Sequence, residues 1–238
     1  MYKGKTIACV IPARLSSSRF PNKPLAKIAG REMVLRVADI ATKSRYVDCI
    51  VIATEDEEIK NLAEDNNYIS VITDKHYTCT HRVAEVANNI IEMDYVFNLQ
   101  GDEPLTKPEW IDEMIEFGVD NNYDMVQSSR KLEEGEIEDE DVVKMVVNNN
   151  RVTHMQRQCD VVCDNIITQL GLYLYRIDVI RDFPNLDMTF VKYWRGLDTI
   201  GFCGKYNVDA LLLPNCGRLQ GIDRPHHIQI VEKELNER

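Results

Sequence analysis

The apolar run Thr6–Ile11 constrains the fold more than any other feature of this chain. It is rich in β-branched residues and nearly unbroken, which is typical of a strand buried on both faces of a parallel sheet. The run Asp94–Leu99 has the same character. Strand patterns alternate with helical ones, with helices predicted over 31–42, 57–66, 82–93, 107–119 and 225–235. This alternation predicts a single α/β domain over residues 1–238.

The loop after the first strand carries three cationic side chains, Arg14, Arg19 and Lys23. Ligands bind where the strands of a parallel sheet end, and guanidinium groups fork onto phosphate oxygens. The serines at 16–18 add hydroxyls and accessible backbone donors. No glycine lies between the strand and Lys23, so this is neither a Walker loop nor a dinucleotide fingerprint. The loop therefore predicts a polyphosphate site held mainly by side chains, the alternative being a solvated loop with ordinary ion pairs.

Two carboxylates follow later apolar runs. Asp102 comes directly after the second strand, in the segment Gln100–Pro104, and Asp223 lies in Gly221–Pro225. Magnesium takes one or two carboxylates together with substrate phosphate oxygens. Asp102 is the natural first ligand, whereas Asp223 is either the second ligand or the cap of the last helix.

Composition excludes several classes of function. The chain has 28 Lys plus Arg against 39 Asp plus Glu, a net charge of −11, which argues against general affinity for nucleic acid or anionic membranes. No apolar stretch has the length of a signal peptide or a membrane span. The seven cysteines lack the paired spacing of a zinc site, so a reduced, cytoplasmic location is expected.

Two further segments have a predicted form. The run 133–141 packs seven acids into nine residues, and a solvated loop or helix start is expected there. Residues 143–147, the triplet Asn148–Asn150 and residues 151–155 predict a β-hairpin, because asparagine tolerates positive φ.

Together these motifs resemble those of the CMP-Kdo synthetases, cytidylyltransferases that activate 3-deoxy-D-manno-octulosonate (Kdo) for lipopolysaccharide or capsule assembly. The family's opening PAR…R-x-P-x-KPL loop is intact over Pro12–Leu25, and its QGDEP motif is Gln100–Pro104. Its GVDTP motif appears as Gly221–Pro225 with Arg224 in place of threonine, and its GIYAYR segment as Gly171–Arg176. The resemblance runs nearly end to end and implies a Rossmann-like nucleotidyltransferase fold, with a mostly parallel mixed sheet flanked by helices.

The resemblance also implies site residues, carried over position by position. Arg14, Arg19, Lys23 and Asp102 would be catalytic, and Asp102 with Asp223 would hold Mg²⁺. The acceptor, a small acidic sugar, would contact Gln100, Arg157 and Gln169, and the hairpin around 143–158 would help to form a homodimer. The residues that would bind CTP are Pro12, Ala13, Arg14, Ser16, Lys23, Thr80, Arg82 and Gln100.

The chain departs from the family mainly on the acceptor side. His81 replaces an acid near the nucleotide base, and Gln169 stands where the family has a histidine that helps to bind the sugar. The family's LEQLR helix is replaced by Tyr193–Thr199, in which Tyr193 and Trp194 form either an altered acceptor wall or part of the core. The expected reaction is transfer of CMP from CTP to Kdo or a related ulosonic acid, with release of pyrophosphate. The alternatives are transfer to another acid, such as a nonulosonic sugar or a phosphonate, and a CTP-binding protein without transfer activity.

Overall fold

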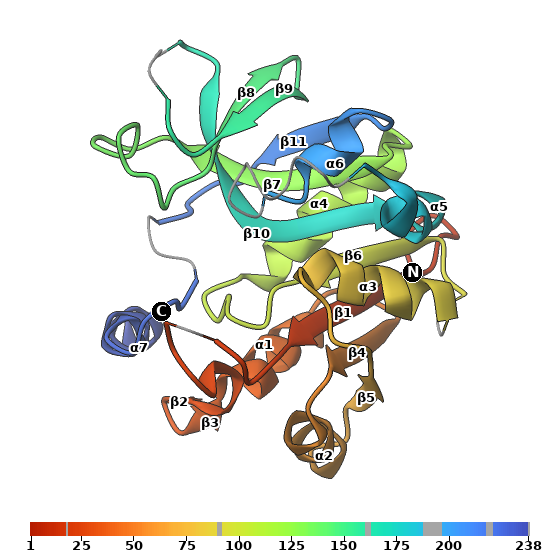
Figure 1. Ribbon diagram of the computed structural model, residues 1–238, viewed down its shortest axis with the longest axis vertical. Helices are drawn as coiled ribbons and strands as arrows, with labels where there is room; N and C mark the ends of the chain where they lie inside the picture. Colours follow the sequence, from red (N-terminus) through yellow and green to blue (C-terminus); the bar gives the residue numbers. More distant parts are fainter. Residues whose placement is uncertain (18, 90–91, 160–162, 188–196, 218–220, 238) are drawn as a thin grey trace.

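The computed structural model describes residues 1–17, 19–89, 92–159, 163–187, 197–217 and 221–237. Its centre is a nine-stranded sheet in the order β5-β4-β1-β6-β10-β7-β11-β9-β8, with helices on both faces (Figure 1). The strands of this sheet are β1 (Ile7–Ala13), β4 (Cys49–Thr54), β5 (Ile69–Ile72), β6 (Tyr95–Leu99), β7 (Met125–Lys131), β8 (Lys144–Asn148), β9 (Arg151–Gln156), β10 (Ile166–Arg176) and β11 (Val208–Leu212). The expected α/β fold with a mixed central sheet is confirmed.

The first half of the sheet is parallel. β1 pairs in parallel with β4 and β6, and β4 with β5, so that their carboxyl ends meet at one edge. Every residue of β1 is buried. Ile7, Cys9 and Ile11 join the core on one face of the sheet, and Ala8 and Val10 join the core on the other. This two-sided burial accounts for the unbroken apolar run in the sequence.

The second half contains the antiparallel pairings. β10 lies antiparallel between β6 and β7 and also pairs with β8, while β7 and β11 are parallel. All antiparallel pairings of the large sheet involve β8, β9 or β10. The register of β10 against β7 shifts between Gln169 and Tyr173. The sheet is therefore parallel where β1, β4, β5 and β6 lie side by side and antiparallel around β10.

The helices form layers on the two faces. α1 (Met33–Ala41), α2 (Glu57–Asp65) and α4 (Pro108–Asp120) contribute to one core, and α3 (Cys79–Asn89) and α5 (Ile177–Asp182) contribute to the other. α7 (His227–Asn236) packs separately, with Val231 in a small cluster against Ile28 and Met33. The remaining short elements are η1 (Lys23–Leu25), β2 (Lys27–Ile28), β3 (Arg31–Glu32), η2 (Phe183–Asn185) and α6 (Ile200–Cys203).

Three helix starts differ by two residues or more from the sequence-based predictions. α3 begins at Cys79 rather than 82, because the Thr78 hydroxyl accepts the N–H of His81 at 3.4 Å in the manner of a helix cap. α1 begins two residues late because Arg31–Glu32 form β3. The last helix begins at His227 rather than 225, so Asp223 does not cap it.

The predicted hairpin is present as β8 and β9 at the edge of the sheet. Its turn contains Asn149 and Asn150, with φ of 47° and 68°. Asparagine is among the few residues that adopt this left-handed conformation readily, which is the reason the sequence indicated a turn here.

Candidate active site

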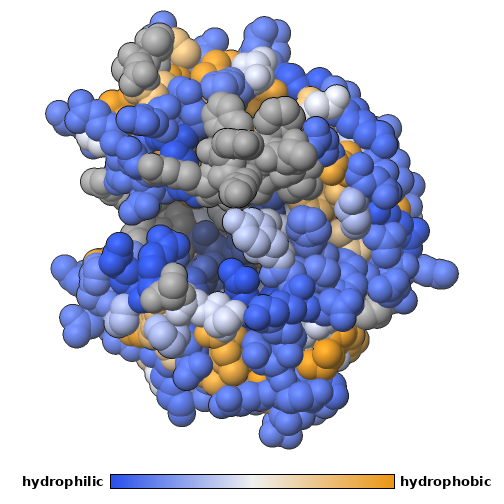
Figure 2. Space-filling model, in the orientation of Figure 1, coloured by the Kyte–Doolittle hydropathy of each residue, from blue (hydrophilic) through white to orange (hydrophobic). Residues whose placement is uncertain are grey.

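The carboxyl ends of β1 and β6 open into a cleft of about 340 Å³. Figure 2 shows the molecule hollowed between its lower, parallel part and its upper, antiparallel part, with hydrophilic residues around the hollow. The residues that line the cleft are Pro12, Ala13, Arg14, Ser16, Ser17, Arg19, Lys23, Pro24, His76, Thr78, Cys79, Arg82, Gln100, Gly101, Asp102 and Asp223. The basic loop and both carboxylates predicted from the sequence thus face one space.

Asp102 and Asp223 converge although they are far apart in the sequence. The N–H of Ile222 donates to the Asp102 carbonyl at 2.9 Å, which holds the two segments side by side. Lys23 Nζ lies 2.5 Å from Asp102 Oδ2 and 3.7 Å from Asp223 Oδ1. The Arg19 guanidinium lies 2.9 Å from the same Asp223 oxygen. Two carboxylates and two cations therefore form one compact cluster.

The close approach of the Asp102 loop to β1 requires a glycine. A Cβ at Gly101 would lie 2.9 Å from the Pro12 carbonyl oxygen, closer than side chains come to backbone oxygens. The basic loop closes on itself just after β1, because the N–H of Asn22 donates to the Leu15 carbonyl at 3.1 Å. Asn22 has a left-handed φ of 56°, and η1 then begins at Lys23. These local turns place Lys23 against Asp102.

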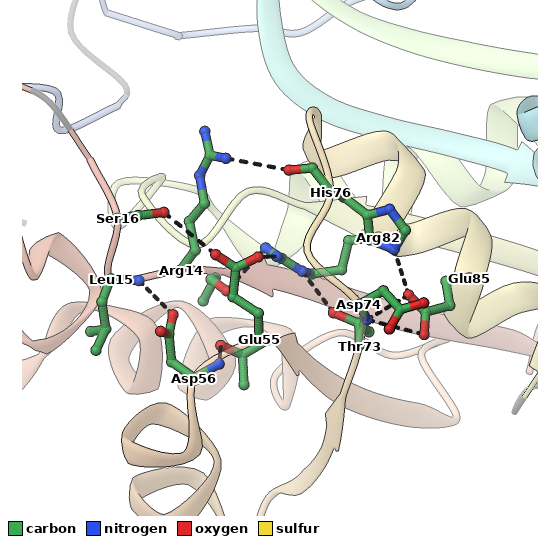
Figure 3. A network of polar contacts seen from close by, with 12 residues as sticks. Arg14, Leu15, Ser16, Glu55, Asp56, Thr73, Asp74, His76, Arg82 and Glu85 are labelled. Carbon is green, nitrogen blue, oxygen red and sulfur yellow. Dashed lines mark hydrogen bonds and ion pairs between the residues drawn. The ribbon is translucent and has the colours of Figure 1, made fainter.

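Arg82 anchors the other wall of the cleft (Figure 3). Its guanidinium donates to Thr73 Oγ1 at 2.9 Å, to the Ala13 carbonyl at 3.2 Å and to Glu55 at 2.6 Å. Only 2% of Arg82 is exposed, and burial lowers its pKa. Arg14 makes a longer contact, 3.5 Å, with the carbonyl of His76. Arg82 therefore shapes the cleft, while Arg14 is the more available for an anion.

Thr80 lies differently from the other predicted nucleotide residues. It is 2% exposed and is not among the residues lining the cleft, where its neighbours Thr78 and Cys79 are found. Burial raises the pKa of the nearby Asp198 carboxylate, although the hydroxyl groups of Thr80 and Thr78 act to lower it. Thr80 is therefore buried beside the cleft and does not line it.

A second, larger cleft of about 730 Å³ adjoins the first. The two share Arg14, Arg19, Gln100, Asp102 and Asp223 among their lining residues. All three predicted acceptor residues, Gln100, Arg157 and Gln169, line this larger cleft. The predicted nucleotide residues other than Thr80 thus line the smaller cleft, and the predicted acceptor residues line the larger one.

The predicted acceptor residues already have protein partners. Gln169 Nε2 donates to Gln127 Oε1 at 2.9 Å and to the Tyr173 hydroxyl at 3.3 Å. Arg157 Nη1 donates to the Asp141 carbonyl at 3.0 Å. Of the divergent segment, Leu197–Thr199 also line the larger cleft, whereas Tyr193 and Trp194 lie outside the described residues.

Glu103 lines the larger cleft beside the carboxylate pair and was not singled out from the sequence. Burial, with Asp102 and Asp223 nearby, raises the pKa of its carboxyl to about 8, although the Gly171 N–H donates to it. The sequence signal was its place in the Gln100–Pro104 motif, where only Gln100 and Asp102 received roles. Asp198 was not singled out either, because Tyr193–Thr199 was interpreted only as a replacement for the family's LEQLR helix.

The acidic run 133–141 is only partly a solvated loop. Glu136 is fully buried and pairs with Arg130, which is 4% exposed, at 2.5 Å. The prediction was wrong for Glu136, because it considered only the acids of the run and not Arg130, which lies three residues before the run. Arg130 also lines the larger cleft.

The donor set fits a hard divalent cation in one place. Asp102 and Asp223 provide two carboxylates next to the basic loop, and such ions bind through one or two carboxylates plus substrate phosphates. Among the described residues no group of three His, Cys, Asp or Glu side chains could hold a metal by itself. Nor does any helix in these parts of the chain have the length and apolar character needed to cross a membrane.

A mixed α/β sheet with a basic loop and paired carboxylates at its strand ends defines a nucleotidyltransferase. The sequence profile of the family described as cytidylyltransferase matches residues 8–196. The chain belongs to the cytidylyltransferase family.

Curated relatives and solved structures agree with this assignment. The chain is 34% identical over 190 residues to the 3-deoxy-manno-octulosonate cytidylyltransferase of an Anaeromyxobacter species, covering 76% of this chain and 78% of the relative. It is 32% identical to the Francisella tularensis protein of that name, covering 97% and 98%. A solved CMP:2-keto-3-deoxy-manno-octonic acid synthetase complexed with CTP superposes with a TM-score of 0.90 at 25% identity, covering 98% and 99% of the two chains. A Leptospira borgpetersenii cytidylyltransferase, at 12% identity and a TM-score of 0.68, shares the fold.

Proposed function

We propose that this enzyme transfers CMP from CTP to a hydroxyl of 3-deoxy-manno-octulosonate or a closely related ulosonic acid. The acceptor oxygen bonds to the α-phosphorus, the bond to the β-phosphate oxygen breaks, pyrophosphate leaves, and the hydroxyl proton is lost. The observation that carries the proposal is the pair of connected clefts, which share Asp102 and Asp223 at their junction. The printed names of the relatives, and the CTP bound in the similar solved structure, support the same substrates.

In this scheme the smaller cleft receives CTP. Arg14, Arg19 and Lys23 neutralise the triphosphate, and Pro12, Ala13, Ser16 and Gln100 complete the wall around it. Phosphoryl transfer depends mainly on positioning and charge neutralisation, so these fixed cations carry much of the catalysis. Asp102 and Asp223 would hold Mg²⁺, which supplies further neutralisation of phosphate charge when bound.

The larger cleft would receive the acceptor. Arg157 and Arg130 bring cations to its wall and suit a carboxylate, while Gln100 and Gln169 offer amides to hydroxyls. A second candidate acceptor is another small acid. It is favoured because residues that differ from the family pattern line this cleft, namely Gln169 and Leu197–Thr199.

Pyrophosphate release with CTP and Mg²⁺ across a panel of ulosonic, nonulosonic and phosphonate acceptors tests the proposal. Kdo or a near relative should give the highest kcat/KM. Faster turnover with a different acid would transfer the assignment to that acid. CTP binding without pyrophosphate release from any acceptor would instead favour a binding protein.

We further propose that the β8–β9 hairpin contributes to a homodimer, because it forms the edge of the sheet, where strands are open to pairing. Sedimentation of the intact protein, compared with a Val147→Lys variant, tests this interface. The seven free thiols agree with a cytoplasmic enzyme.

A further inference from the structure

The cationic groups of Lys23 and Arg19 lie on the two carboxylates that would hold the metal. Lys23 Nζ contacts Asp102 at 2.5 Å and Asp223 at 3.7 Å, and Arg19 contacts Asp223 at 2.9 Å. Lys23 is 14% exposed, so its ammonium is partly shielded from water at this position, whereas Arg19 is about half exposed. The same two cations also line the cleft assigned to the triphosphate.

An ammonium and a divalent cation compete for the same carboxylate oxygens. Both are attracted by the negative charge, and they repel each other strongly at short range where water is partly excluded. A metal ion arriving alone must therefore displace Lys23 without offering it another anion. A nucleotide offers that anion, because its triphosphate carries more negative charge than the two carboxylates together.

We propose that Lys23, assisted by Arg19, is a positioning residue that holds Asp102 and Asp223 together before substrate binds and makes metal binding depend on the nucleotide. The triphosphate draws the two side chains toward its oxygens, and the released carboxylates then accept the metal. Lys23 thus contacts the two carboxylates before the nucleotide binds and the triphosphate afterwards. This inference rests on the proposed function for the identity of the nucleotide and the metal.

The thermodynamic consequence is a coupling between the two ligands. If CTP strengthens metal binding by some factor, the metal must strengthen CTP binding by the same factor. Removal of the Lys23 charge relieves the repulsion that opposes the metal alone, so the variant should bind metal more tightly in the absence of nucleotide. The same variant should bind CTP more weakly and lose most of the coupling.

The test measures Mn²⁺ binding by electron paramagnetic resonance of the free ion, with and without CTP and with no acceptor present. The variants are Lys23→Met and Arg19→Met, and Lys27→Met is the matched control, since Lys27 is an exposed lysine paired with Glu32 at 3.5 Å. Mn²⁺ alone should bind Lys23→Met at least tenfold more tightly than the wild type, and Arg19→Met by a smaller factor. The control should match the wild type. Asp102→Asn in the Lys23→Met background should abolish the gain.

Two results would overturn the inference: equal Mn²⁺ affinity of Lys23→Met, Lys27→Met and the wild type, or wild-type Mn²⁺ affinity that is unchanged by CTP. Circular dichroism checks that each variant is folded, and Arg19→Met changes a half-exposed side chain that the fold does not require. Because no acceptor enters the measurement, these outcomes are separate from the identity of the sugar acid. Absence of any effect of CTP together with absence of pyrophosphate release would instead refute the proposed function.

Discussion

Replacement of Arg82 by methionine should destabilise the protein strongly, although Arg82 lines a ligand cleft. The guanidinium joins three elements, through Thr73 after β5, the carbonyl of Ala13 at the end of β1 and the carboxylate of Glu55 after β4. The two ionic side chains are 3% and 14% exposed. Methionine fills much of the same volume and leaves the Glu55 charge without its partner.

The expected magnitude follows from this burial. Loss of one partner of a buried ion pair costs about 3–5 kcal/mol. Glu55 retains some contact with water, so the lower end, about 3 kcal/mol, applies. For a chain of this length 1 kcal/mol corresponds to roughly 2–4 °C in Tm, which places the expected loss at roughly 6–12 °C.

Urea and thermal unfolding followed by circular dichroism measure this change. Lys3→Met is the control, because Lys3 and Asp120 form an exposed pair at 2.7 Å whose attraction is screened by water. Adding Glu55→Gln to Arg82→Met should recover part of the loss, since it removes the unpaired charge. An Arg82→Met protein as stable as Lys3→Met would refute the argument that this ion pair organises the cleft wall.

Three further predictions concern the site and its support. Gly171→Ala places a Cβ against Glu103 Oε1, so it should cost about 1–3 kcal/mol in urea unfolding and lower kcat, while Gly204→Ala, with open space at its Cβ, should do neither. Lys23→Ala should lower turnover at least a hundredfold while the protein stays folded, and near wild-type pyrophosphate release would remove Lys23 from the mechanism. The backbone N–H of Thr6 and the Lys5 ammonium lower the pKa of Asp94 in the folded protein. Ionised Asp94 therefore stabilises the fold above the usual pKa of 3.8, and this stabilisation is lost as the pH falls below that value. Asp94→Asn should flatten the acid limb of a stability–pH curve.

The nucleotide side was predictable because its determinants are local. An apolar strand followed by a charged loop specifies both the sheet edge and the group placed there, and Lys23, Asp102 and Asp223 did meet at that edge. The convergence of Asp223 required long-range information, which the resemblance supplied. Thr80, which the resemblance assigned to the nucleotide, is buried and does not line the smaller cleft.

The larger cleft was less predictable, because the properties of the charged groups in and around it depend on how deeply they are buried and not on residue type alone. Glu136 looked like one acid of a solvated run, yet it is buried against Arg130. Glu103 received no role from the sequence, yet it is packed tightly enough that position 171 has no room for a Cβ beside it. The packing of Glu103 beside position 171 joins segments far apart in the chain. Arg130 lies only six residues before Glu136, but the sequence does not show that both side chains are buried.

The antiparallel insertion of β10 explains why the two halves of the site can diverge separately. β10 pairs with β6, whose end carries Asp102, and its irregular stretch between Gln169 and Tyr173 forms part of the acceptor cleft. Gly171 in this stretch packs against Glu103, so the backbone of β10 is tied to the metal-side loop. Gln169 and Leu197–Thr199 line the larger cleft but not the smaller one. Substitutions there can alter acceptor choice while the phosphate loop and the carboxylate pair stay in place, which is the pattern this chain shows against its family.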